Sequence, residues 1–167
     1  YATQDFLNNA TFCNYRVINR GALAIDSTYI AVWDDCDLGY AFDDYIGCDT
    51  SRGLGIQYNG TNDDGGSAGH PVNSYGSTHP QVGLDFFQGP KRIVGDTAIQ
   101  LGMTNFTYYN NDFSIIGNPD NGVQIYNYMT GSIRDGERFA DDFQGPGSQS
   151  KGYGSGPVSN FVFWGDP

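Results

Sequence analysis

Apolar residues along this chain come in short runs, separated by segments rich in glycine, asparagine and aspartate. The runs contain many aromatic and β-branched residues, which favour strands over helices. Two runs near the N-terminus, residues 12–18 (FCNYRVI) and 28–33 (TYIAVW), flank a segment with turn residues, so we predict that they pair as an antiparallel hairpin. The further strands that the pattern predicts are residues 54–58, 82–87, 106–109, 113–116, 123–129 and 161–164.

One segment is compatible with either a helix or a strand. Residues 121–130 (NGVQIYNYMT) follow a Pro119-Asp120 turn and end before Gly131, which is typical of a short helix. Their aromatic and β-branched side chains suit a strand equally well, so the pattern leaves both structures open. We therefore expect an all-β domain over residues 1–167, an antiparallel, jelly-roll-like β-sandwich with long loops and at most one short helix.

The charge of the chain narrows the classes of partner. Eight lysine and arginine residues stand against 19 aspartate and glutamate residues, a net charge of -11. Nucleic acids and anionic lipid surfaces are bound by clustered basic residues, so both are excluded as partners, and no apolar stretch is long enough for membrane insertion. The acidity and the scarcity of lysine indicate an extracellular or cell-surface protein, with a cation or a neutral ligand as the favoured partner.

The densest acidic segment is residues 33–49, WDDCDLGYAFDDYIGCD, which contains six aspartates and no basic residue. Calcium takes six to eight oxygen ligands, mainly carboxylates and carbonyls, and Gly39 and Gly47 would allow the sharp turns that such a loop needs. The spacing is not that of an EF-hand, and a solvated acidic loop is the alternative. The predicted calcium ligands are Asp35, Asp37, Asp43, Asp44 and Asp49.

No pattern of catalytic residues is visible in the sequence. A glycosidase needs two carboxylates across the sugar bond, and the only glutamate, Glu137, lies in a charged segment beside arginines. His70 and His79 each precede a proline, and no serine–histidine or cysteine–histidine signature accompanies them. We therefore expect a non-enzymatic protein. Tyr40 and Tyr45, near the acidic segment, are candidates for stacking on sugar rings, which gives a carbohydrate-binding module as the alternative function.

Several motifs together resemble one family. They are the acidic segment read as D-x-D-L-G followed by D-D-[aromatic]-x-G-C-D, then NYRVINRG, SRGLGIQYNG, VGLDFFQGP, YYNNDFSIIGNP and the closing FVFWGDP. The combination resembles a module of large secreted and cell-surface proteins of Bacteroidota that are exported by the type IX secretion system. The resemblance spans nearly the whole chain. It implies an extracellular, calcium-stabilised, β-rich module within a larger surface assembly.

The resemblance also bears on the cysteines. Cys48 lies on the family pattern, whereas this sequence has Cys36 where proline is usual and Cys13 where an apolar residue is usual. Two departures to cysteine together imply a Cys13–Cys36 disulfide and leave Cys48 as a buried free thiol. A Cys36–Cys48 bond is the alternative.

The resemblance further implies a modification and a role. Proteins of this group can carry O-linked sugars at Asp-Ser/Thr followed by a small or apolar residue, so Thr97 and Ser27 are candidate sites. The expected function is that of an adhesion or structural module, such as a repeat or subunit of a cell-surface fibre. Its partners would be other copies, other modules of a surface protein, or a polysaccharide.

Overall fold

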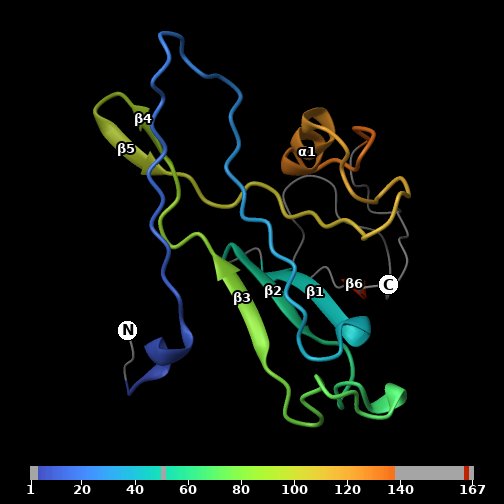
Figure 1. The fold of residues 1–167 in the computed structure, drawn as a ribbon. Helices are drawn as coiled ribbons and strands as arrows, with labels where there is room; N and C mark the ends of the chain where they lie inside the picture. The colour runs from blue at the N-terminus through green and yellow to red at the C-terminus, as the bar shows by residue number, and fades with distance from the viewer. Residues whose placement is uncertain (1–3, 50–51, 138–163, 166–167) are drawn as a thin grey trace.

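A four-stranded antiparallel sheet lies at the centre of the structure, which is a computed structural model that describes residues 4–49, 52–137 and 164–165 (Figure 1). The sheet has the order β3-β2-β1-β6, with β1 at Asp44–Asp49, β2 at Leu54–Asn59, β3 at Gln81–Asp85 and β6 at Trp164–Gly165. Asp44 pairs with Asn59 and Asp49 with Leu54, so β1 and β2 match along their full length. The strands predicted at residues 54–58 and 82–87 are confirmed as β2 and, in its main part, β3.

A second, two-stranded sheet is formed by β4, Lys91–Val94, and β5, Thr97–Gln100. The hydrophobic pattern did not predict this hairpin, although its turn has a clear signal. Gly95 has a φ of +60° and Asp96 follows it without a positive φ, as in the II′ turns that suit hairpins. All eight strand residues are exposed, so the hairpin buries no face of its own in the described part of the chain.

The one α-helix among the described residues, α1, spans Gly122–Met129, which resolves the helix-or-strand alternative in favour of the helix. The Asn121 side chain caps it by accepting from the amides of Val123 and Gln124 at 3.0 and 3.1 Å. Tyr128 on α1 packs with Ile116 and Ile133, and Ile46 of β1 contacts this cluster. The cluster therefore joins the helix to the central sheet. Three 3₁₀ turns complete the elements: η1 (Phe6–Asn9), η2 (Ala41–Asp43) and η3 (Gly66–Ala68).

Residues 10–33, here called the N-terminal arm, form a long excursion without strands (Figure 1). The predicted hairpin of residues 12–18 and 28–33 is therefore wrong for this structure, as are the strands at 106–109 and 113–116. Among the described residues, no backbone–backbone hydrogen bond involves residues 11–37. Strand propensity reports how well a side chain fits a pleated, half-buried surface, and none of the described strands pairs with the arm.

The fold class is thus confirmed at the level of a mostly β chain with one short helix and two antiparallel sheets. None of the helices in the described part of the chain is long and apolar enough to span a bilayer. Residues 161–163 of the last predicted strand lie outside the described residues, and Trp164 belongs to β6. The densest set of buried polar side chains lies in the loops around β1 and β2, and these loops form the candidate site.

Candidate functional site

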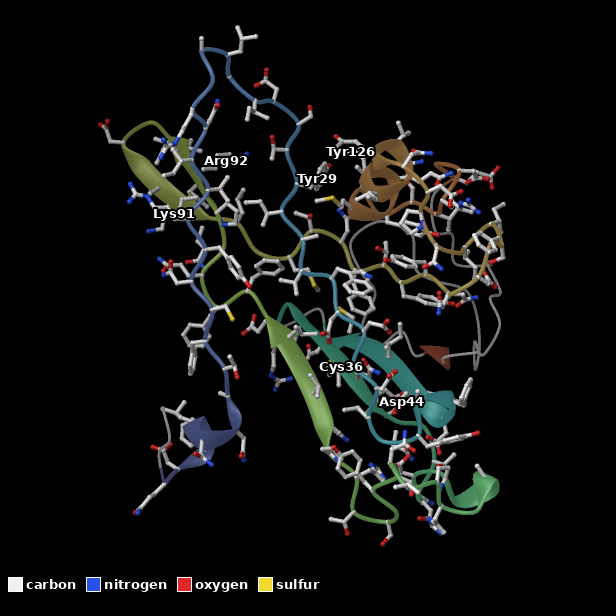
Figure 2. The ribbon with its side chains drawn as sticks, in the orientation of Figure 1. Tyr29, Cys36, Asp44, Lys91, Arg92 and Tyr126 are labelled. Carbon is white, nitrogen blue, oxygen red and sulfur yellow. The ribbon has the colours of Figure 1, made fainter. Side chains whose placement is uncertain are left out.

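Asp44 opens β1 and ties the preceding loop to the sheet. Its Oδ2 accepts a hydrogen bond from the backbone amide of Leu38 at 2.8 Å, deep in the protein. The side chain of Gln57, on the neighbouring strand, donates to the same oxygen at 3.4 Å and also to the carbonyl of Cys36. A carboxylate that accepts backbone amides holds a loop in one conformation. Figure 2 shows Asp44 and Cys36 close together at this end of the sheet.

Asp43, one residue earlier, faces the loop that follows β2. Its Oδ2 accepts from the amide of Gly65 at 2.9 Å and from the hydroxyl of Thr61 at 3.4 Å. Asn59, at the end of β2, donates from Nδ2 to the carbonyl and hydroxyl oxygens of the same Thr61 at 2.7 and 3.0 Å. Asp43 Oδ1 and Asn59 Oδ1 are both buried without a hydrogen-bond partner. Two acceptor oxygens beside one threonine are thus left without a donor, which is costly in a protein interior.

Asp64 is the most deeply buried carboxylate in this region, with 0% of its surface exposed. Its Oδ1 accepts from the amide of Tyr40 at 2.9 Å, and its Oδ2 accepts from the amide of Tyr75. The Asp64 amide donates to the carbonyl of Gly76 at 3.0 Å. The Asp64 side chain lies so close to Gly39 that a Cβ added to Gly39 would collide with it. Gly39 also has a φ of +79°. Glycine is therefore required there for both conformation and space.

The five predicted calcium ligands do not share one location. Asp43 and Asp44 lie side by side but face different loops, and the Asp49 carboxylate accepts from the side chain of Arg52. Asp35 and Asp37 are exposed. In the described ranges, no group of three or more histidine, cysteine, aspartate or glutamate side chains is arranged to hold a metal ion. The expected sharp turn at Gly47 is wrong, because Gly47 lies within β1 and pairs with Ile56.

The three cysteines are free thiols, so the structure does not form the predicted Cys13–Cys36 disulfide or its Cys36–Cys48 alternative. Cys48 is buried, as expected, and burial followed by the charge of Asp49 raises the pKa of its thiol to about 11. The Cys36 thiol donates to Asp34 Oδ2 at 2.9 Å. Burial, this hydrogen bond and the nearby aspartates raise the pKa of Cys36 to about 11, so the thiol is a weak nucleophile at neutral pH.

The two candidate sugar-stacking tyrosines belong to different environments. The ring of Tyr45 lies edge-on to Tyr58 at 6.0 Å and covers Gly60, where an added Cβ would strike it. Burial and the neighbouring Tyr45 raise the pKa of Tyr58 to about 12. Tyr40 is half-buried and packs against the exposed Phe42 at 5.4 Å. Tyr45 is therefore packed into the sheet surface, whereas the pair of Tyr40 and Phe42 is open on one side.

The two candidate glycosylation residues are both exposed. Thr97 begins β5 beside the hairpin turn. Ser27 lies in the N-terminal arm with a φ of +53°, and its carbonyl accepts from the hydroxyl of Tyr126 at 3.1 Å. Their position in accessible segments is compatible with modification.

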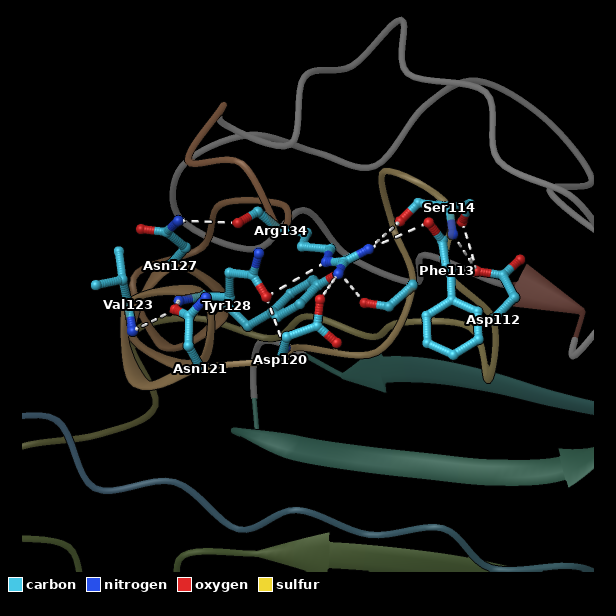
Figure 3. Close-up of polar contacts among 11 residues, drawn as sticks. Asp112, Phe113, Ser114, Asp120, Asn121, Val123, Asn127, Tyr128 and Arg134 are labelled. Carbon is cyan, nitrogen blue, oxygen red and sulfur yellow. Dashed lines mark hydrogen bonds and ion pairs between the residues drawn. The ribbon is translucent and has the colours of Figure 1, made fainter.

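A second polar cluster, which the sequence did not predict, is centred on Arg134 (Figure 3). Its guanidinium donates to the carbonyls of Phe113 and Ser114 at 3.1 and 3.4 Å, to the carboxylate of Asp120, and to Gln124 Oε1 at 3.3 Å. One side chain thereby fastens the loop before the helix to α1. The planar, five-donor guanidinium suits several acceptors at once.

One feature of the sequence could have revealed part of the aspartate site. The loop NGTNDDGG contains a second Asp-Asp pair, Asp63-Asp64, beside glycines, and it resembles the Asp43-Asp44 pair in composition. The pattern indicated only a turn-rich loop. Asn59 and Gln57 had no distinguishing signal, because their role depends on the register between β1 and β2.

The chain matches no protein-family model, no curated protein and no solved structure. Any function must therefore be argued from the sequence and from the contacts described above.

Proposed function

We propose that this chain is a non-enzymatic, extracellular structural or adhesion module, a repeat or subunit of a cell-surface assembly, whose acidic loops take up calcium. Support for a structural role comes from the aspartates themselves. Asp43, Asp44 and Asp64 each accept a hydrogen bond from the backbone amide of another loop residue. Carboxylates that accept backbone amides in this way organise loops and do not serve to bind a substrate.

The observation that carries the cation is the pair of unpartnered oxygens, Asp43 Oδ1 and Asn59 Oδ1. Only 9% of Asp43 and 5% of Asn59 is exposed, so bulk water does not satisfy them. A hard divalent ion binds carboxylate, amide and hydroxyl oxygens, which are the groups that Asp43, Asn59 and Thr61 offer. The oxygen chemistry of these side chains therefore supports such an ion, with Asp43 kept from the predicted ligand set and Asn59 added. Bound there, the ion would offset the charge of the loops.

The β-sandwich of the sequence prediction remains part of this proposal. A sandwich needs a second sheet against the first. The exposed β4–β5 hairpin is the described segment that would contribute to it.

Calcium titration followed by thermal unfolding tests the cation. An ion that binds only the folded chain raises its stability, so saturating calcium should raise the melting temperature by several degrees and a chelator should reverse the shift. The Asp43→Asn variant removes the carboxylate charge and should abolish the shift. An Asp63→Asn variant, changed at a half-exposed neighbouring carboxylate, is the matched control. An unchanged melt with and without calcium in all variants would refute the cation.

A further inference from the structure

The N-terminal arm contains a strand-prone run, residues 12–18, that belongs to no strand in the structure. In an extended run over residues 12–18, Cys13, Tyr15 and Val17 would share one face and Asn14 and Arg16 the other. Tyr15 is 82% exposed and Val17 is 78% exposed. The backbone of this run has no backbone partner in the part of the chain that the structure describes. Both its amides and its apolar side chains are therefore available to a neighbour.

A matching surface exists on the central sheet. β3 has a neighbouring strand only on the β2 side within the described residues, so its other edge is open. Its sequence QVGLD contains neither lysine nor proline, the residues with which proteins commonly protect an edge. Val82 and Leu84 lie half-buried on one face. An open edge with alternating side chains is the usual receptor for an added strand.

Basic and acidic residues are concentrated in different parts of the molecule. The N-terminal arm and the β4–β5 hairpin contain four basic residues, Arg16, Arg20, Lys91 and Arg92, and two acidic ones, Asp26 and Asp96. The other described residues contain two basic and 14 acidic residues. The two parts thus have net charges of +2 and -12. Figure 2 shows Lys91 and Arg92 at one end of the molecule and Asp44 towards the other.

The two charged parts lie towards opposite ends of the molecule, and this placement favours a second copy over the same chain as the partner of the arm. The middle of the arm lies at the end of the molecule opposite to the loop that follows β2 (Figure 1), so this loop of the same chain is far from it. A second copy offers the acidic surface and the open β3 edge together. An interface between two different surfaces of identical chains is heterologous, and it propagates into a filament unless the rotation closes a ring.

We propose that residues 12–18 of one copy add as a strand to the open edge of β3 in a second copy, guided by the attraction between the net-positive arm and hairpin of one copy and the net-negative remainder of the other. This inference rests on the proposed role as a subunit of an assembly and names the surfaces that would join. The run of residues 12–18 exceeds the five residues of β3 in length, so it can cover the whole edge.

Hydrogen exchange and light scattering of the full chain test this directly. The expected result is an assembly whose mass grows over about a hundred-fold range of concentration and falls as salt is added. Amides of residues 12–18 and 81–85 should become protected together as the assembly forms. Val17→Pro removes a backbone donor from an exposed residue outside all elements, so it should weaken association by about ten-fold or more and leave the monomer folded. Val17→Thr keeps the donor and the β-branched shape, and it should still assemble.

Each other outcome overturns the inference. Protection that does not depend on concentration would mean that the arm folds onto β3 of its own chain. Assembly without protection of these two segments would mean that a different surface joins the copies. A monomer at every concentration, or protection that needs an added acidic polysaccharide, would exclude the second copy as the partner. The calcium-dependent melt measured on the monomeric Val17→Pro variant separates failure of this inference from failure of the cation site.

Discussion

The aspartate loops and the N-terminal arm are both long segments without much regular structure, but they are organised in opposite ways. The loops around β1 and β2 are rich in aspartate and glycine, and their backbone amides are bound by buried carboxylates such as Asp43 and Asp64. The arm is richer in aromatic and β-branched residues, yet it has few contacts. Phe12 touches Phe87, and Tyr29 touches Tyr126.

The difference shows that polar anchors, more than apolar content, decide which loops are fixed in this chain. Each unpaired buried amide costs about 1–3 kcal/mol, and a carboxylate that accepts two of them removes that cost twice. Apolar side chains stabilise only when a partner surface removes them from water. Within the described residues the arm has few such contacts beyond Phe12–Phe87 and Tyr29–Tyr126, and it is the segment we expect a second copy to cover.

Among the changes that test the difference between the loops and the arm, replacing Asp64 should have the largest effect on stability. Asp64→Asn turns one of the two acceptor oxygens into a donor that faces the amide of Tyr40 or Tyr75. We expect a loss of about 2–5 kcal/mol in the free energy of unfolding, measured by urea denaturation. Asp63→Asn, at the half-exposed neighbour, should cost less than about 1 kcal/mol. Equal losses in the two variants would contradict the anchoring role of Asp64.

Replacing Arg134 should have the next largest effect. Arg134→Ala leaves the carbonyls of Phe113 and Ser114 without this donor, and we expect a loss of about 1–3 kcal/mol in the free energy of unfolding. Arg134→Lys should recover only part of it, because an ammonium group lacks the planar fork. Arg16→Ala in the exposed arm is the matched control and should leave the melting temperature of the monomer unchanged. A full recovery with lysine would show that charge alone matters at this position.

The smallest effects should be seen in the reactivity of the three thiols. Labelling them compares the arm, which contains Cys13, with the region of β1, which contains Cys36 and Cys48, without changing the fold. Exposed Cys13 should react first with iodoacetamide at pH 8. With its pKa raised to about 11, Cys36 is about one part in a thousand thiolate at that pH, so it should react slowly and gain speed as the pH rises towards 11. Cys48 should react only on unfolding, since it is fully buried. Mass spectrometry of labelled peptides measures all three, and fast labelling of Cys48 in the native protein would contradict its place in the sheet.

The raised thiol pKa values also set a direction for stability. The folded state favours the protonated thiols of Cys36 and Cys48, whose ordinary pKa is 9.0, so their contribution is complete below pH 9 and is lost as the pH rises through about 11. A Cys48→Ala variant lacks one of these thiols. Between pH 7 and about 11, its free energy of unfolding should therefore fall by less than that of the unchanged protein.

By itself, the sequence determined the coarse class of the fold, two of its strands and the acidity of the segment around β1. Alternation of apolar residues and turn signals between runs are local properties, and they correctly indicated β2 and the main part of β3. The segment 121–130 was left open because helix and strand preferences balance there. The Asn121 cap and the packing of Tyr128 on Ile116 and Ile133 decided for the helix.

The tertiary structure alone decided how the acidic segment is used. Asp44–Asp49 became a central strand rather than part of a loop, because β2 and β6 lie on either side of it. The same register brought Asn59 opposite Asp44, and the loop after β2 carried Asp64 beneath Gly39. These contacts join residues far apart in sequence, so no local pattern contains them. For the same reason the strand-prone arm remained without a sheet: its propensity is local, whereas pairing depends on a neighbouring strand, and no described strand pairs with it.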